Sequence, residues 1–332
     1  MALFMIGTQR SGSNLLRLML NQQPAIAAPH PPHILERFMP LLPLYCDLQS
    51  DRNFDRLVDD ICRMIELNPV PWEGVSLDRG TVKDCCFDRS LMAVYGAVHD
   101  LMSEAKGAFV WCCKSLANVH FVHEITAFFP DARFIYLYRD GRDVAVSFRK
   151  AVVGEKSFYH IARNWHEEQQ LALNLRDRTD PGDFFSLSYE ELTSNTEATL
   201  RRLMGHFNIP FDEDMLTFNI SEDAHATAKS GSLWANVVQP VMKDNTRKYL
   251  REATEEDIRT FESVAGESLD RLGYERSFID KGEELQFSES EIQAFEEENS
   301  RLKKEISLRI TPGELLLRRP QQQLLEEIKA RR

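Results

Sequence analysis

The stretch "LFMIGTQRSGSNLLRLML", residues 3–20, decides the fold. It joins a short apolar run at 2–6 to a leucine-rich helical pattern at 15–20 through a loop of small polar residues. An apolar run of this length is typical of a buried parallel strand. A loop that leads from such a strand into a helix presents free backbone N–H groups at the positive end of the helix dipole. The sequence therefore predicts an anion-binding loop at residues 7–14.

This loop differs from the phosphate loop of nucleoside triphosphatases. Gly7 and Gly12 have the separation found in the G-x-x-x-x-G-K-[ST] pattern. Ser13 and Asn14 stand where that pattern has Lys and Ser/Thr, and the positive charge lies inside the loop, on Arg10. The side chains that hold the outer phosphates and Mg²⁺ are thus missing, so we expect an anion other than a magnesium triphosphate. A plain Gly/Ser turn in an α/β domain is the alternative.

Composition limits the classes of function that remain. The chain has 332 residues, of which 43% are hydrophobic, so it can bury a sizeable core. Its net charge of −12 argues against a nucleic-acid partner and requires any anion site to be a local cluster. The six cysteines include two adjacent pairs and have no zinc spacing, so we expect reduced thiols, no metal and a cytoplasmic protein. We also expect no signal peptide and no membrane span.

Further apolar runs predict three more strands, at 107–114, at 132–143 together with a turn, and at 183–192 running into a helix. Helical patterns fill 120–130 and follow Asp143, whereas the prolines of 25–45 predict a loop without regular structure. Strands that alternate with helices predict an α/β fold, a P-loop-like parallel sheet flanked by helices on both faces.

Polar side chains follow the ends of the predicted strands. Arg10, Lys114, Arg139 and Tyr189 all lie just past such an end. Because ligands of parallel sheets bind at the carboxyl ends of the strands, these four side chains are expected to converge on one site.

The C-terminal part of the chain has a different composition. We expect an α/β domain over 1–280 and a helical C-terminal extension over 281–332. Residues at spacings of three and four form a short heptad run there: Leu285, Ser288, Ile292, Phe295, Asn299, Leu302 and Ile306. Asn299 would occupy a core position, as in register-fixing dimers. A homodimer through a short coiled coil at 283–310 and a helix folded onto its own body are both open.

A second motif, "YRDGRDVAVSF" at 138–148, adds another anion-binding group. Arg139 leaves a predicted strand and Ser147 lies on the first turns of the next helix. A guanidinium fork and a hydroxyl donor suit a phosphate monoester. A solvated turn rich in ion pairs is the alternative.

Together, the stretches 8–20 and 138–148 resemble the 5′-phosphosulfate loop and the 3′-phosphate motif of the sulfotransferase superfamily, most of all its bacterial and tyrosylprotein-type members. "SYEEL" at 188–192 is similar to the family's segment near the adenine, and 229–250 is similar to its C-terminal cofactor loop. The resemblance spans residues 2 to about 275. It implies in-line transfer of a sulfuryl group from 3′-phosphoadenosine 5′-phosphosulfate to a hydroxyl, without metal. The product nucleotide would be adenosine 3′,5′-bisphosphate, and the acceptor a small molecule, carbohydrate or lipid.

The resemblance also implies roles for individual residues. Arg10 and Lys114 would stabilise charge on the oxygen that leaves sulfur, with Ser230 or Ser232 completing the group. The residues expected to hold the cofactor are Arg10, Ser11, Gly12, Ser13, Asn14, Arg139, Ser147, Tyr189, Lys229 and Ser230.

The general base is less well defined by the resemblance, because family members with a glutamate have it near Pro31. The segment "PHPPHILERF" offers His33, which we take first, then His30, then Glu36. Two other functions remain open. One is a nucleotide or small-molecule kinase with a degenerate phosphate loop, and the other is a non-catalytic nucleotide-binding scaffold.

Overall fold

A computed structural model of the protein describes residues 1–331, except for the side chains of Ser232 and Leu233. Five strands form one sheet: β1 (Ala2–Ile6), β2 (Ile26–Ala27), β3 (Val110–Cys113), β4 (Arg133–Tyr138) and β5 (Phe184–Ser188). The strand order is β2-β3-β1-β4-β5, and every pairing is parallel. The predicted parallel sheet is therefore confirmed, and the strands are shorter than the apolar runs suggested.

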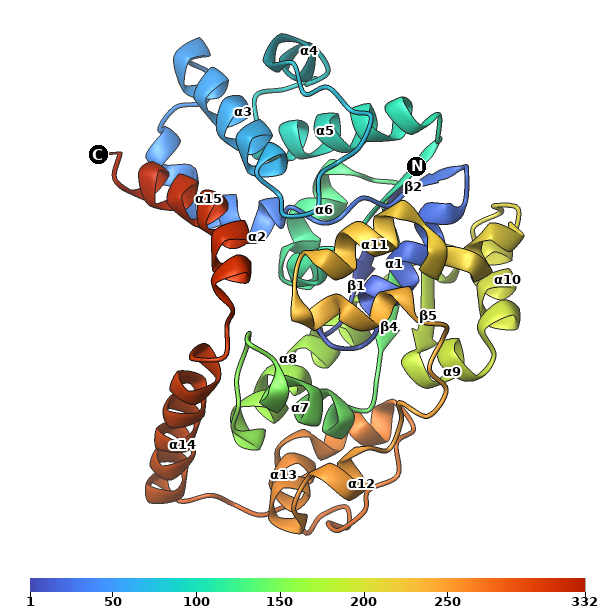
Figure 1. The fold of residues 1–332 in the computed structure, drawn as a ribbon, viewed down its shortest axis with the longest axis vertical. Helices are drawn as coiled ribbons and strands as arrows, with labels where there is room; N and C mark the ends of the chain where they lie inside the picture. The colour runs from blue at the N-terminus through green and yellow to red at the C-terminus, as the bar shows by residue number, and fades with distance from the viewer. Residues whose placement is uncertain (332) are drawn as a thin grey trace.

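Helices connect the strands and cover both faces of the sheet (Figure 1). Up to β5 these are α1 (Ser13–Gln22), α2 (Ile34–Phe38), η1 (Met39–Tyr45), α3 (Asp51–Glu66), α4 (Arg79–Asp84), α5 (Leu91–Lys106), η2 (Leu116–Phe121), α6 (Val122–Phe128), α7 (Gly141–Lys150), α8 (Phe158–Arg176) and η3 (Pro181–Asp183). After β5 come α9 (Tyr189–Ser194), α10 (Thr196–His206), η4 (Glu213–Ile220), α11 (Glu222–Lys229), η5 (Ser232–Val238), α12 (Tyr249–Glu252), α13 (Glu255–Arg271), α14 (Glu289–Ser307) and α15 (Pro312–Lys329).

Alternation along β1 divides the core between the two faces of the sheet. Phe4 and Ile6 pack on one face with residues of α3 and α5, and Leu3 and Met5 pack on the other with residues of α1 and α10. A third apolar cluster joins α7, α8 and α13. The first strand is thus covered on both faces, which is why its sequence reads as a continuous apolar run.

Two local predictions are wrong. The range 25–45 contains β2, α2 and η1, because α2 fits between Pro32 and Pro40, and Pro40 lies in the first turn of η1, where the missing N–H of proline is tolerated. Helix α7 begins at Gly141 rather than behind Asp143, because the Asp140 carboxylate caps it by accepting from the backbone N–H of Arg142 at 3.0 Å.

The C-terminal extension folds back along one side of the molecule, from α13 past α8 to α3 (Figure 1). In α14, Asn299 is buried and its Oδ1 accepts from the backbone N–H groups of Lys156 at 2.7 Å and Ser157 at 3.1 Å. In α15, the Gln321 amide donates to the carbonyl oxygen of Met64 at 2.8 Å. The heptad asparagine therefore contacts its own chain, and the homodimer through 283–310 stays a prediction. Within the described part of the chain, no helix has the length and apolar character needed to cross a membrane.

Candidate active site

The carboxyl ends of the strands open into one cavity of about 940 Å³. Eleven of the residues singled out by the sequence line it: Arg10, Gly12, Ser13, Asn14, His30, His33, Glu36, Lys114, Arg139, Ser147 and Tyr189. The expected convergence past the strand ends therefore takes place.

The loop between β1 and α1 is shaped by two glycines with positive φ. A Cβ at Gly7 (φ +137°) would lie 2.1 Å from the carbonyl oxygen of Leu137, and a Cβ at Gly12 (φ +87°) would lie 2.4 Å from the Tyr189 ring. Gly12 is also the N-cap of α1, and no side chain caps this helix. The N–H groups of its first turn are therefore available to a ligand.

Polar atoms of the loop lack partners. The Ser11 hydroxyl oxygen and the Asn14 side-chain oxygen are buried and make no hydrogen bond with any described residue. Buried polar groups are normally satisfied, so these atoms are unusual, and of the two residues Asn14 lines the cavity. Ser11 itself is fully buried and does not line the cavity wall.

Arg139 joins the loop to the second motif. It donates from Nη1 to the Arg10 carbonyl oxygen at 3.0 Å and from Nη2 to the Asn245 carbonyl oxygen at 2.6 Å. Its guanidinium carbon lies 4.4 Å from the centroid of the Tyr189 ring, and its buried Nε has no partner among the described residues. The Tyr189 hydroxyl in turn accepts from the Asn245 amide at 2.7 Å. Both terminal nitrogens thus orient the guanidinium, Nη2 also lies 3.7 Å from Asp143 Oδ2, and Nε stays without a partner among the described residues.

Arg10 and Ser147 connect the two motifs directly. The Arg10 backbone has φ +73°, and its Nε donates to the Ser147 hydroxyl at 3.0 Å. The two anion-binding groups predicted separately from the sequence therefore form one cluster.

Lys114 follows β3 and is 8% exposed at the cavity wall. No carboxylate of the described residues is among the groups that act on its pKa. Burial lowers the pKa of its ammonium to about 7, with further lowering by the positive charges of Arg17 and Arg10. An anion bound beside Lys114 would raise this pKa again.

The base candidates His30, His33 and Glu36 line the same cavity as the loop at 7–14. His30 is buried, with Nδ1 3.1 Å from Asn68 Oδ1, and burial holds its pKa well below the ordinary histidine value. His33 is the N-cap of α2 with φ +56°, and its Nδ1 lies 3.2 Å from Glu36 Oε2. Burial also lowers the pKa of His33, although the contact with Glu36 opposes this.

Three sequence candidates are not brought to the cavity or fall outside the description. Lys229, at the end of α11, is exposed, and Ser230 is buried with its hydroxyl donating to the Thr227 carbonyl oxygen at 2.7 Å. The Ser232 side chain lies outside the described residues. In place of Lys229 and Ser230, the segment after them contributes Trp234, Asn236 and Asn245 to the lining.

Sequence reasoning missed several cavity residues. Asn68 follows α3, and Glu168 on α8 has a buried carboxylate oxygen without a partner among the described residues. Burial raises the pKa of Glu168 to about 7, although a hydrogen bond with Thr8 acts in the opposite direction. Arg318 and Gln321 of α15 form part of the wall. A lone polar residue in a helical or loop pattern gives no signal for such a position.

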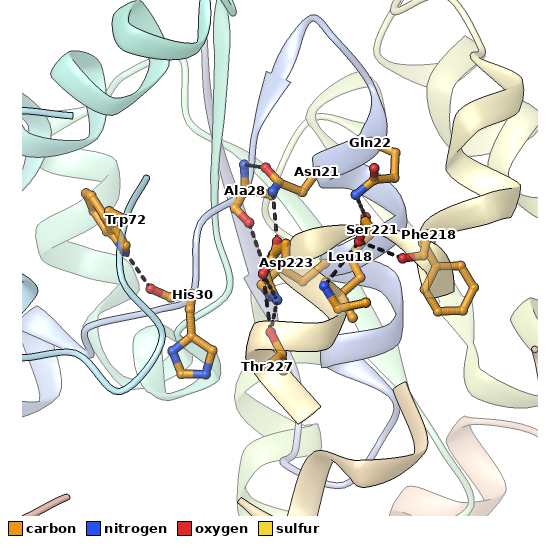
Figure 2. Close-up of polar contacts among 12 residues, drawn as sticks. Leu18, Asn21, Gln22, Ala28, His30, Trp72, Phe218, Ser221, Asp223 and Thr227 are labelled. Carbon is orange, nitrogen blue, oxygen red and sulfur yellow. Dashed lines mark hydrogen bonds and ion pairs between the residues drawn. The ribbon is translucent and has the colours of Figure 1, made fainter. Parts of the chain in front are cut away.

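A buried network holds α11 against α1 beside this cavity. The fully buried Arg17 contacts Asp223 through both terminal nitrogens, at 2.7 and 3.0 Å, and also donates to the Ala28 carbonyl oxygen and the Thr227 hydroxyl. Figure 2 shows Asp223 and Thr227 facing Ala28 and Asn21 within this network. The network ties α11 to α1, the helix that follows the loop at 7–14.

Among the residues that the structure describes, no group of three or more His, Cys, Asp or Glu side chains is placed to hold a metal ion. All six cysteines are free thiols.

The sequence of this chain is similar to those of known enzymes. A model of the sulfotransferase family matches residues 2–213. Protein-tyrosine sulfotransferase A of Caenorhabditis elegans is 23% identical over 280 residues, which cover 82% of this chain and 67% of the relative. Protein-tyrosine sulfotransferase 1 of Danio rerio is 22% identical over 290 residues, covering 82% of this chain and 72% of the relative.

Solved structures share the fold. The sulfotransferase domain of the Synechococcus PCC 7002 olefin synthase superposes with a TM-score of 0.59 at 16% identity, covering 83% of this chain and 94% of that one. The sulfotransferase domain from the curacin biosynthetic pathway gives 0.55 at 18% identity, covering 83% and 98%. With the family match over more than half of its residues, the chain belongs to the sulfotransferase family and is an enzyme that transfers sulfuryl groups.

Proposed function

We propose that the donor is 3′-phosphoadenosine 5′-phosphosulfate and that its sulfuryl group is transferred in line to an acceptor hydroxyl. The observation that carries this proposal is the half-buried Arg10–Ser147 contact, because it joins the loop before an uncapped helix N-terminus to the Arg139–Ser147 motif in one cavity. A nucleotide with phosphates at both the 5′ and the 3′ positions needs two anion-binding groups, one for each phosphate. The unpartnered Ser11 hydroxyl and Arg139 Nε are donors that would suit these anions.

Different residues of the chain would bind the two ends of the donor and stabilise the leaving oxygen. The N–H groups of residues 11–14 would hold the 5′-phosphosulfate, and Arg139 with Ser147 would hold the 3′-phosphate. Tyr189 would lie beside the adenine. When bound, the donor supplies an activated sulfuryl group whose transfer has a loose transition state, as in phosphoryl transfer. Arg10 and Lys114 would stabilise the charge that develops on the leaving oxygen.

A histidine is the base that the geometry favours. His30 is neutral near pH 7, because burial and the nearby charges of Arg17 and Lys114 lower its pKa, and its Nε2 is buried at the cavity without a partner among the described residues. His33 Nδ1 also lacks a hydrogen bond with any described residue, but it lies 3.2 Å from the Glu36 carboxylate, which raises the pKa of His33. We therefore place His30 ahead of His33, which reverses the order that the sequence suggested.

The acceptor class follows from the relatives rather than from the cavity. Both curated relatives are named for transfer to protein tyrosine. This favours a phenolic hydroxyl of a tyrosyl group over the small-molecule, carbohydrate or lipid hydroxyl expected from the sequence. The kinase alternative has no specific support, since Ser13 and Asn14 replace the Lys and Ser/Thr of a magnesium-triphosphate loop.

The test is calorimetric titration of the purified protein with adenosine 3′,5′-bisphosphate without magnesium, beside ATP and ADP with and without it. We expect selective binding of the bisphosphate, and we expect Arg139→Ala to abolish it. Arg163→Ala, an exposed arginine on α8, serves as the charge-matched control. ATP binding that requires magnesium would exclude this donor. Transfer of labelled sulfate from the donor to a tyrosine peptide and to simple alcohols would then compare the acceptor classes.

A further inference from the structure

We propose that Asn68 is a positioning residue that holds His30 in the tautomer with the proton on Nδ1, so that Nε2 is free to accept a proton. This inference rests on the proposed function only for the identity of the reaction, since the tautomer itself is a property of the free protein. Asn68 lies in the loop that follows α3 and is 6% exposed, and His30 is 7% exposed.

The orientation of the Asn68 amide is set by four contacts. Its Nδ2 lies 3.3 Å from the His30 carbonyl oxygen and 3.4 Å from the Pro31 carbonyl oxygen. Its Oδ1 accepts from the Val70 backbone N–H at 3.3 Å and lies 3.1 Å from His30 Nδ1. Carbonyl oxygens only accept and a backbone N–H only donates, so exchanging the amide oxygen and nitrogen would break three contacts. The group facing His30 Nδ1 is therefore an acceptor.

This orientation determines the imidazole. With an acceptor 3.1 Å away, Nδ1 must carry the proton, and in a neutral imidazole the lone pair then lies on Nε2. That atom is buried, has no partner among the described residues, and belongs to a side chain that lines the cavity. Nε2 is thus the nitrogen that an acceptor hydroxyl can reach.

The surroundings keep the imidazole neutral. Positive charge faces it from three elements: Arg17 on α1, Lys114 after β3, and His33 at the N-cap of α2 when protonated. Burial is the largest cause of its lowered pKa, and the bond to Asn68 raises the pKa only in part. A neutral amide at this position orients the ring without the large increase in pKa that a carboxylate would cause.

The chain around Asn68 holds the other side of His30. The Trp72 indole donates to the His30 carbonyl oxygen at 2.7 Å, and Figure 2 shows the imidazole pointing away from that indole. The Trp234 and His30 rings pack in a T-shaped arrangement, with centroids 5.3 Å apart. Residues 68–72 therefore hold both the backbone and the ring of His30.

In the reaction, the acceptor hydroxyl gives its proton to Nε2, and the electron pair of the broken O–H bond stays on the acceptor oxygen. The imidazole becomes an imidazolium with a proton on each nitrogen. Asn68 Oδ1 continues to accept from Nδ1–H throughout, so the ring does not have to turn during proton transfer. The Asn68 amide is engaged by His30, Pro31 and Val70, so its effect on the reaction passes through His30.

The test uses the full chain, with the imidazole nitrogens observed by ¹⁵N NMR and the His30 signals identified by their loss in His30→Gln. We expect the wild type to show a protonated Nδ1 and an unprotonated Nε2. In Asn68→Ala we expect a mixture of tautomers. Asn68→Asp should keep the Nδ1–H form and raise the His30 pKa. Trp72→Phe is the matched control, because it removes a neighbouring contact to His30 but leaves the ring pair, and its tautomer should stay as in the wild type.

Two results would overturn the assignment: a wild-type His30 protonated at Nε2, or an unchanged tautomer in Asn68→Ala. With the donor and N-acetyltyrosinamide as probe acceptor, kcat of Asn68→Ala should fall about 10- to 100-fold. In Asn68→Asp, kcat should begin to fall at a higher pH than in the wild type, because His30 is protonated more easily. An unchanged pH profile would also contradict the assignment. Failure of adenosine 3′,5′-bisphosphate to bind the wild type would refute the proposed donor while leaving the tautomer result intact.

Discussion

The Arg10 guanidinium donates from Nε to the Ser147 hydroxyl at 3.0 Å, across 137 residues of sequence. The contact links the loop after β1 to helix α7, and Arg139 reinforces it by donating to the Arg10 carbonyl oxygen at 3.0 Å. Both ends of this contact are assigned to the donor nucleotide. In the free protein they satisfy one another, so binding must exchange this hydrogen bond for contacts with the ligand.

A double-mutant cycle tests that exchange. Arg10→Ala, Ser147→Ala and the double variant should show a coupling of about 1 kcal/mol in the free energy of unfolding of the free protein, the size of a single hydrogen bond. With saturating adenosine 3′,5′-bisphosphate the coupling should disappear, because the two side chains then contact ligand. Urea unfolding with and without the nucleotide provides both values. An undiminished coupling in the complex would mean that the contact persists.

Lys114 should take up a proton when the nucleotide binds. Its pKa of about 7 leaves it largely neutral at pH 8, and the bound anion raises that pKa. Binding heats measured at pH 8 in buffers with different ionisation enthalpies should therefore reveal proton uptake. The uptake should vanish in Lys114→Met and persist in Lys243→Met, an exposed lysine outside the cavity lining. Equal uptake by both variants would assign the proton to another group.

The same lysine makes a contribution to stability that depends on pH. Between about pH 7 and 10.5 the unfolded chain holds a proton on this side chain that the folded chain has lost. Stability of the free protein from this group should therefore rise as pH rises through that window.

The contribution of Glu168 to stability should change with pH in the opposite direction to that of Lys114. Its pKa is raised from 4.5 to about 7, so between those values the folded state keeps a proton that the unfolded state has released. Its contribution to stability is fully present below about pH 4.5 and is lost as pH rises through 7. Glu168→Gln should therefore be more stable than the wild type at pH 8, by at most about 3 kcal/mol, and by much less at pH 5.5. Thermal unfolding at the two pH values measures this, with the exposed neighbour Glu167→Gln as control.

The Arg17–Asp223 pair should be among the most costly polar contacts to break. Arg17→Met would leave the Asp223 carboxylate, whose side chain is 20% exposed, without its partner, at a cost of about 3–5 kcal/mol. Arg17→Met combined with Asp223→Leu should recover part of that loss. The exposed pair Arg201 and Glu197 on α10 should cost less than about 1 kcal/mol when it is broken. Urea unfolding of the variants measures these differences, and equal costs for the two pairs would contradict the role of burial.

Asn299→Leu separates the two readings of the heptad run. If α14 is held to its own body, the variant loses the bonds to the N–H groups of Lys156 and Ser157, and protease should cut the extension faster. If the run forms a coiled coil, a leucine at a core position should strengthen self-association. Limited proteolysis and sedimentation of the same sample compare the outcomes, with exposed Glu297→Leu as control.

The sequence predicted the sheet and the cluster of Arg10, Arg139 and Ser147, because each is written in a local pattern: an apolar run, a glycine pair, or a charge just past a strand end. Lys229 and Ser230 were predicted to bind the cofactor, but their side chains do not reach the cavity. Helix α11 continues to Lys229, and the Lys229 side chain is exposed to solvent. The position of α11 depends on the Arg17–Asp223 network, which links residues 206 apart in sequence. No local pattern encodes such a contact.

Asn68 and Glu168, on the proposed acceptor side of the cavity, were the hardest site residues to predict. They too depend on contacts between residues that are far apart in the sequence. Asn68 matters through the imidazole it contacts 38 residues away, and Glu168 through its burial beside Thr8. The proline-rich segment hid β2 and α2, because two-residue strands and five-residue helices are stabilised by neighbours rather than by their own periodicity.

The cavity wall combines Thr8, near the start of the sequence, with Gln321 in α15, while α14 holds the loop at 155–157 that faces the same space. During translation, the loop at 7–14 therefore leaves the ribosome long before the part of the wall that α15 supplies. A nascent chain can form this loop early, but the cavity lacks its α15 wall until more than 300 further residues have been added. The full cavity is thus acquired late in synthesis, and a chain released before α15 would keep the cavity open on that side.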